Sequence, residues 1–285
     1  MKKYIVLCGL LIWFNSLQSQ NFARLSRNYV DLKNYYCVDS AYLRCSYKLS
    51  YSCDTLNKDI QSTDKQTLLI GQNASKYYSQ IALDYNQYIK EYIKRNHDYP
   101  NASDGAWTYE VFKNYPQGKS TVTDIGSALK SDFLYEEDLP IFNWEITREK
   151  QTILSYNCQK ATTTFRGRDY TAWFTTDIPI DNGPWKFAGL PGLILKLYDS
   201  NENFVFECEG LEYLRNKEPI KFYKLNYAKI EREDLYKLYK RIHDDRAAYN
   251  KTLGIMTMEM DEKTRTSKIV DYSSSKIPYN PIELK

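Results

Sequence analysis

Between residues 152 and 223, strand-like segments follow one another with only short polar turns between them. The turns fall at residues 166–169 and 199–203, where Gly, Asp and Asn collect, and these residue types favour chain reversal. Parallel neighbours in a sheet need a crossover of about a dozen residues or more, so such short connections require antiparallel pairing. This stretch therefore predicts an antiparallel meander and limits the chain to folds built on one.

Strand patterns also occur earlier in the chain. Alternation and short apolar runs predict strands at residues 42–51, 66–71 and 142–147. A hairpin is expected from residues 109–115 and 119–124, which flank a turn at Pro116, Gln117 and Gly118. In the meander, alternation places on one face the side chains of Leu193, Leu195, Leu197, Phe204, Phe206 and Cys208.

Two stretches have helical periodicity. The first follows Asn73 and Ser75, and its apolar side carries Ile81, Tyr85, Tyr88, Ile89 and Tyr92. The second covers residues 231–250, with an apolar side of Leu235, Leu238, Tyr239, Ile242 and Tyr249. The predicted fold class is therefore α+β: a mainly antiparallel, curved, half-barrel-like meander with two longer helices packed against its concave face.

Residues 183–195 contain three Gly, two Pro, a Trp and a Phe before an apolar run. Gly permits positive φ and close backbone approach, while Pro fixes φ and removes a donor. We expect residues 189–192 to form a tight, mostly buried turn with Leu190 and Leu193 packed inward and Trp185 close by. The segment Gly189, Leu190, Pro191, Gly192, Leu193 and Ile194 is interpreted as a rigid structural lid, with a docking surface for a partner as the alternative.

The N-terminus has the pattern of a secretory signal. Lys2 and Lys3 precede an apolar run over residues 4–14, and small and polar residues follow at 16–20. We expect cleavage near Gln20, which gives a signal peptide at residues 1–20 and one domain at residues 21–285. Periplasmic or secreted localisation follows. No later run approaches the ~20 apolar residues needed to span a bilayer, so no transmembrane segment is expected in the mature chain.

Charge and composition exclude several classes. The formal net charge of +3 falls to +1 once Lys2 and Lys3 leave with the signal peptide. Basic and acidic residues are interspersed, so no nucleic-acid partner is expected. The 27 tyrosines suit half-buried strand surfaces, or alternatively a face that stacks a carbohydrate or another ligand.

Five cysteines follow the predicted signal: Cys37, Cys45, Cys53, Cys158 and Cys208. Their spacing fits no zinc motif and no C-x-x-C-H haem motif, so we expect neither a metal nor another cofactor. An oxidising compartment permits disulfides. The expected pair is Cys158 with Cys208, or alternatively Cys37 with Cys45 or Cys53.

Catalytic motifs are scarce. The two histidines lie in charged helical segments, and Gly-x-Ser-x-Gly does not occur, so no catalytic residue is assigned. Asp169, Asp177 and Asp181 could serve a carboxylate-dependent hydrolase, but their positions beside Gly and Asn favour roles in turns.

Four residues are candidates for binding. Arg166 and Arg168 flank a Gly and could hold an anion bidentately, or instead form ion pairs with Asp169, Asp177 or Asp181. Trp173 and Trp185 could stack a ligand, or instead close a core. A binding role and a structural role both remain open for each of the four.

Several motifs occur together in order along the chain. They are residues 156–161 (YNCQKA), 165–168 (FRGR), 172–175 (AWFT), 183–187 (GPWKF) and 189–194 (GLPGLI), followed near the end by 279–283 (YNPIE). This set resembles the GLPGLI family, exported proteins of Bacteroidetes-type bacteria. The resemblance is dense over residues 140–200 and implies an envelope protein. The family has no assigned activity, so the resemblance supplies no catalytic residues.

The function expected from these observations is that of a non-catalytic binding protein of the cell envelope. Its ligand would be apolar or amphipathic, or its partner an outer-membrane transport protein or another envelope protein. The alternatives are a carboxylate-dependent hydrolase and a purely structural envelope component.

Overall fold

The computed structural model describes residues 3–7, 11–13, 30–55, 61–97, 107–126, 131–252, 256–260, 267–269 and 278–285. A twelve-stranded, open and mostly antiparallel sheet dominates these residues. In spatial order it contains β14 (Ala228–Lys229), β8 (Phe133–Asp138), β7 (Lys119–Asp124), β6 (Tyr109–Lys113), β5 (Ser75–Ser79), β4 (Gln61–Ile70), β3 (Tyr35–Ser52), β13 (Phe204–Tyr223), β12 (Leu193–Asp199), β11 (Arg168–Thr175), β10 (Tyr156–Phe165) and β9 (Glu145–Ile153). The fold is thus mainly β rather than α+β, and the sheet is not closed.

The meander predicted for residues 152–223 is present, but its limits differ: its first strand, β9, begins at Glu145, and residues 220–223 continue β13 instead of forming a further strand. Strands β9 to β13 are consecutive in sequence and adjacent in space, and each pairs antiparallel with the next. Two-residue turns connect the first three strands, with positive φ at Leu154 and Ser155 and again at Arg166 and Gly167. Two successive positive φ values match the twist of hairpin strands, which explains the Arg-Gly pair between β10 and β11.

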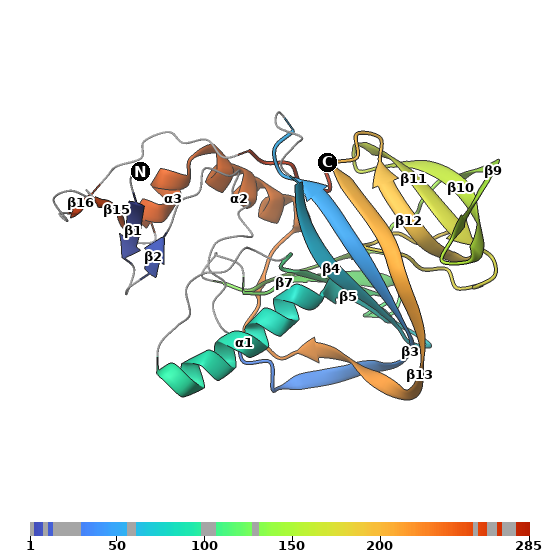
Figure 1. Cartoon of the computed structure of the whole chain (residues 1–285), viewed down its shortest axis with the longest axis horizontal. Helices are drawn as coiled ribbons and strands as arrows, with labels where there is room; N and C mark the ends of the chain where they lie inside the picture. The colour runs from blue at the N-terminus through green and yellow to red at the C-terminus, as the bar shows by residue number, and fades with distance from the viewer. Residues whose placement is uncertain are drawn as a thin grey trace.

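Strands β3 and β13 form a long two-stranded ribbon in the middle of the sheet. They cover 18 and 20 residues, and their pairing shifts register between Cys208 and Gly210 and again between Tyr213 and Glu218. Register shifts of this kind bend strands. Figure 1 shows the blue and orange strands running side by side and then turning sharply toward the side where α1 lies. The bend is absent from the sequence prediction, which gave these strands shorter lengths.

The main core lies on one face of the sheet. The side chains of Leu193, Leu195, Leu197, Phe204, Phe206 and Cys208 all belong to it, as the alternation predicted. A second, smaller hydrophobic cluster consists of Ala41, Leu69, Tyr78, Phe112 and Ile220. Neighbouring residues such as Leu68 and Leu69 divide between the two clusters, because successive side chains of a strand point to opposite faces.

The helices differ from the prediction in position. Helix α1 (Gln80–Asn96) begins later than expected, after β5, and the Ser79 side chain caps it by accepting from Ala82 N. The second predicted helix is divided into α2 (Arg232–Asp244) and α3 (Arg246–Thr252). Leu235 of α2 packs in the main core, whereas Leu83 of α1 packs against the smaller cluster. The two longer helices therefore do not share one concave face.

A second, four-stranded sheet involves the N-terminal residues. It contains, in order, β16 (Ser267–Ile269), β15 (Met256–Met260), β1 (Lys3–Leu7) and β2 (Leu11–Trp13). Strands β1 and β2 fall within the predicted signal peptide, and the predicted cleavage region at residues 16–20 lies outside the described residues. Among the helices of the described ranges, none is long and apolar enough to cross a membrane.

Candidate functional site

The 183–195 segment packs its apolar side chains inward as predicted, but the turn at residues 189–192 is not mostly buried, because Gly189 and Pro191 are exposed. Leu190 and Leu193 are buried, and Trp185 and Phe187 are fully buried. Gly189 has a φ of 89°, and Gly192 N donates to Leu190 O at 2.7 Å. The segment is therefore part of the core of this fold.

A buried lysine holds this segment in place. Lys113 of β6 donates from Nζ to Gly183 O at 2.6 Å and to Phe187 O at 3.1 Å. Burial lowers the pKa of Lys113 to about 7, against the opposing effect of the Asp181 carboxylate. The low pKa shows that desolvation of the ammonium outweighs its attraction to that carboxylate.

Arg166 and Arg168 are both engaged with carboxylates. Arg168 is 7% exposed and pairs with Asp199 at 3.0 Å, while Arg166 pairs with Glu137 at 2.7 Å. The prediction that ion pairs involve Asp169, Asp177 or Asp181 was therefore wrong in its partners. Asp199 and Glu137 come from distant segments, so sequence proximity could not identify them.

A larger ionic cluster surrounds Lys186, which is fully buried. Its Nζ lies 2.5 Å from Glu137 Oε1 and 2.7 Å from Glu283 Oε1. Arg232 adds a second cation, 3.5 Å from Glu283 Oε2. We call Arg166, Lys186, Arg232, Glu137 and Glu283 the ionic cluster. Because it is nearly enclosed, removal of one member leaves a buried charge incompletely compensated.

Of the three carboxylates considered for hydrolysis, only Asp177 lies in a turn. Asp169 belongs to β11, so its expected position in a turn was wrong, and Asp181 lies in an irregular segment. Asp169 accepts from Thr164 Oγ1 at 2.6 Å, Asp177 accepts from Asn157 N at 3.4 Å, and Asp181 accepts from Gly189 N. None of the three lines the main pocket described below. The described residues also contain no group of three or more His, Cys, Asp or Glu that could hold a metal ion.

The cysteines are not paired as predicted. Cys37, Cys45, Cys158 and Cys208 carry free thiols, so neither the Cys158–Cys208 bond nor a bond to Cys37 is formed. Strands β11 and β12 separate the strands of Cys158 and Cys208. Adjacent strands lie ~4.8 Å apart, and three such steps exceed the ~7 Å Cα separation that a disulfide spans.

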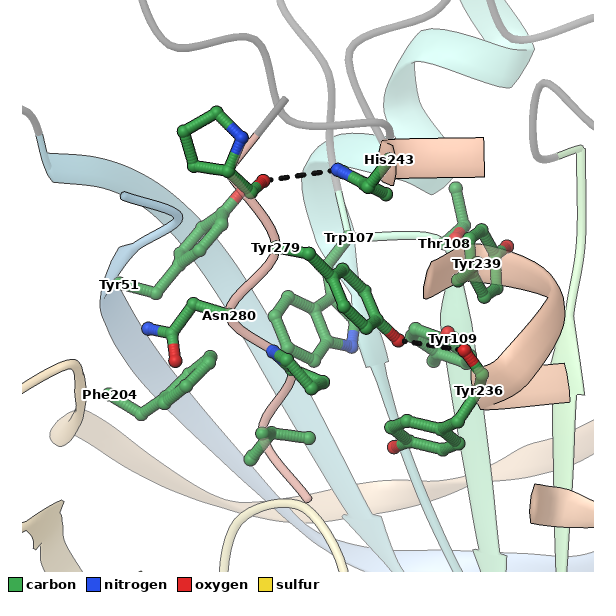
Figure 2. Close-up of a pocket in the computed structure, with 13 residues that line it drawn as sticks. Tyr51, Trp107, Thr108, Tyr109, Phe204, Tyr236, Tyr239, His243, Tyr279 and Asn280 are labelled. Carbon is green, nitrogen blue, oxygen red and sulfur yellow. Dashed lines mark hydrogen bonds between the residues drawn. The ribbon is translucent and has the colours of Figure 1, made fainter. Parts of the chain in front are cut away.

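The main pocket lies where α2 and the chain end meet the sheet. It encloses about 90 Å³ and is lined by Tyr51, Trp107, Thr108, Tyr109, Phe204, Tyr236, Tyr239, His243, Pro278, Tyr279, Asn280, Pro281 and Ile282. Figure 2 shows the strand side chains Tyr51 and Phe204 on one side and the helix side chains Tyr236 and Tyr239 on the other, with Tyr279 between them. We call this the aromatic pocket.

Trp107 organises the aromatic pocket. Its ring meets Tyr51 edge-on at 5.4 Å and Trp185 edge-on at 5.7 Å, and it lies 6.2 Å from Phe204. Asp64 Oδ2 accepts from Trp107 N at 2.6 Å and fixes its backbone. Edge-to-face aromatic contacts are favourable beyond area burial alone, so the walls form a rigid, preorganised surface.

The lining of the aromatic pocket is polar at a few points and carries no lysine, arginine, aspartate or glutamate. Burial raises the pKa of Tyr109 and Tyr236 well above that of a free tyrosine, so both hydroxyls stay protonated at neutral pH. His243 Nδ1 lies 3.0 Å from Pro278 O and donates to it. The pocket thus offers apolar rings and neutral hydrogen-bonding groups.

The predicted binding residues lie behind this pocket or away from it. Trp185 packs against Trp107 and Tyr109, and Arg168 donates to Ile282 O at 3.1 Å. Both support the pocket wall from the core. Trp173 is partly buried against the main core and does not line the pocket.

Sequence reasoning missed most of the pocket. Tyr236, Tyr239 and His243 are spaced three and four residues apart, which places them on one helix face. His243 is only 3% exposed, although it lies in a charged helical segment. The high tyrosine content and the YNPIE segment were the signals that could have indicated the site.

One family model matches a short segment of the chain, and two crystal forms of one solved protein resemble part of it. A family model described as "Protein of unknown function (Porph_ging)" matches residues 165–196, from the end of β10 into β12. No curated protein matches the chain. PNGF-II is similar in structure in two crystal forms: the P21 form at 14% identity and a TM-score of 0.46, and the C2 form at 15% and 0.44. The matches cover 70% and 69% of this chain but only about a third of PNGF-II, at 33% and 32%.

Proposed function

We propose that this protein is a non-catalytic binding protein that holds one uncharged ring or chain end of an amphipathic ligand in the aromatic pocket. The observation that carries the proposal is the lining: seven aromatic rings surround one cavity, and its remaining side chains are uncharged or belong to His243. Sites of this composition hold ligands by apolar contact and orient them with a few polar groups.

The size of the pocket restricts the ligand. Pockets for drug-sized molecules enclose roughly 300–1,000 Å³, whereas an engineered dry cavity that binds benzene encloses about 150 Å³. The aromatic pocket, at about 90 Å³, suits a single ring or chain end whose remaining part stays outside. A charged group is disfavoured, because the lining contains no lysine or arginine to replace its lost hydration.

A pair of probes of similar size tests this proposal. We expect 4-fluorobenzyl alcohol to bind at least about tenfold tighter than 4-fluorobenzoate, a difference of about 1.4 kcal/mol, when both are titrated by ¹⁹F NMR. Tyr236→Ala removes one wall and should weaken binding of the alcohol, whereas Tyr88→Ala, at a tyrosine of α1 that is 51% exposed, should not. Equal affinity for the two probes, or equal binding by the two variants while both stay folded, would contradict the proposal.

We also infer export to the periplasm or beyond the cell, and membership of the GLPGLI family. The support is the basic and apolar start of the chain together with the ordered motifs over residues 156–194. An outer-membrane transport protein or another envelope protein is the partner class that this location favours. Mass spectrometry of protein recovered from the envelope or medium should find an N-terminus near residues 19–23, and a retained Met1 would show that no signal peptide is removed.

A further inference from the structure

The last eight residues, 278–285, lie in a groove between α2 and the turn that joins β10 to β11. We call them the C-terminal segment. Leu284 N donates to Arg166 O at 2.8 Å in that turn, and Arg232 of α2 donates to Lys285 O at 2.7 Å. Figure 2 shows the start of the segment, with Tyr279 and Asn280, passing between the sheet and the helix. Both sides of the groove therefore hold the segment.

One side of the groove recognises the backbone of the segment. Arg168 donates from Nη2 to Pro281 O at 2.6 Å and to Asn280 Oδ1 at 2.5 Å, besides its contact with Ile282 O. Tyr170 donates from its hydroxyl to Ile282 O at 3.0 Å. Asn280 Nδ2 donates to Ser52 O at 2.7 Å. These contacts require an extended segment with Asn at this position.

The other side recognises a carboxylate. The Glu283 side chain is fully buried, and its Oε1 lies 2.7 Å from Lys186 Nζ and accepts from Trp185 Nε1 at 3.1 Å. Its Oε2 lies 3.5 Å from Arg232. Hydrogen bonds to an ionised carboxylate from several donors are among the stronger contacts in proteins.

Several ion pairs of the groove do not involve the C-terminal segment. Arg168 pairs with Asp199 at 3.0 Å, and Arg166 and Lys186 pair with Glu137 at 2.7 and 2.5 Å. Within the ionic cluster, however, the three cations face only one carboxylate outside the segment, that of Glu137. The surface under the segment therefore carries an excess of positive charge at the position of Glu283.

We propose that this groove is a peptide-binding site for an extended segment of pattern Asn-Pro-apolar-Glu, and that the C-terminal segment is its intramolecular ligand. The site adjoins the aromatic pocket, whose lining includes residues 278–282 of the segment, but it differs in chemistry, since it recognises backbone carbonyls and one carboxylate. Because it is part of the same chain, the C-terminal segment competes with any free peptide at a high effective concentration. A free peptide of the same sequence therefore gains access when the resident segment is weakened by substitution.

The test uses the full chain with Glu283→Lys and a fluorescein-labelled peptide with the sequence of residues 278–285. The substitution places a positive charge beside the three cations of the ionic cluster, and their repulsion weakens binding of the resident segment. We expect this peptide to bind the variant at least about tenfold tighter than the wild type, by fluorescence anisotropy. The same peptide with Gln in place of its Glu should bind at least about tenfold more weakly. Competition by unlabelled peptide serves as the specificity control.

A second variant, Asn280→Ala, removes contacts to Ser52 and Arg168 but leaves the groove intact. If Glu283→Lys fails to fold alone, we expect the free peptide to restore a cooperative thermal transition. The proposal is overturned if folded variants bind no peptide, if the Glu and Gln peptides bind equally, or if neither variant folds and peptide restores neither. If 4-fluorobenzyl alcohol does not bind, the proposal for the aromatic pocket fails, and the peptide measurements still decide the proposal for the groove.

Discussion

Gly192→Ala is expected to destabilise the protein by about 3 kcal/mol, at the upper end of the usual cost of overpacking a core. A Cβ atom at this position would lie 2.0 Å from Thr175 O and 2.6 Å from the Thr175 carbonyl carbon. The obstructing atoms are backbone, and Thr175 pairs with Leu193 in the β11–β12 ladder. Relief of the clash therefore requires the turn at residues 189–192 and the end of β11 to move apart.

Gly210→Ala is the matched control for this substitution. Gly210 lies in β13, and an added Cβ would meet no atom within 4 Å. Urea denaturation of the two variants should show a large fall of the midpoint for Gly192→Ala and little change for Gly210→Ala. Similar midpoints for both would mean that residues 189–194 are not packed as a rigid part of the core.

Lys186→Met is expected to destabilise the protein by about 4 kcal/mol, the cost of breaking a buried ion pair by removing one partner. Lys186 contacts both carboxylates of the ionic cluster, and neither it nor Glu283 is exposed. Met approximates the length of the side chain without its charge. Lys119→Met serves as the control, because Lys119 and its partner Asp138 are largely exposed and surface pairs contribute little.

A double-mutant cycle separates the ion pair from packing. Glu283→Gln removes the second charge, so Lys186→Met should cost less in that background than in the wild type, with a coupling of about 1 kcal/mol or more. The measurement is the free energy of unfolding of the four proteins at one pH. Additive costs would show that Lys186 stabilises the fold through its apolar stem and aromatic neighbours rather than through Glu283.

The parts of the fold that were predictable depend on neighbouring residues. The hairpin at Pro116–Gly118 and the strands flanking Arg166–Gly167 were located because turn residues act within about four positions. Strand β5 was missed because its five residues are all buried and show no alternation that would separate them from the following helix. Strand β8 was missed because its burial does not alternate either: two adjacent residues are buried and the others are partly or fully exposed.

The candidate site was less predictable. Arg166, Arg168 and Trp185 were predicted as candidates for binding, with ion pairing or core packing as the alternative. Their partners lie far along the chain: Trp185 donates to Glu283, 98 residues away. The aromatic pocket draws on β3, β6, β13, α2 and the C-terminal segment. A tyrosine in any one of these elements is ordinary for a strand or a helix, so the sequence does not indicate that it lines a pocket.

By itself, the sequence determined antiparallel pairing of the consecutive strands from residue 152 to residue 208, the Gly and Pro turn at residues 189–192 and the amphipathic character of α2. Each of these depends on short-range sterics and on the period of apolar side chains. Only the tertiary structure decided that Lys186 meets Glu137 and Glu283, and that aromatic rings from five segments enclose one pocket. The physical reason is burial. Close packing in the core brings together side chains of complementary shape and charge from distant segments, and the spacing of residues along the chain does not show which segments these are.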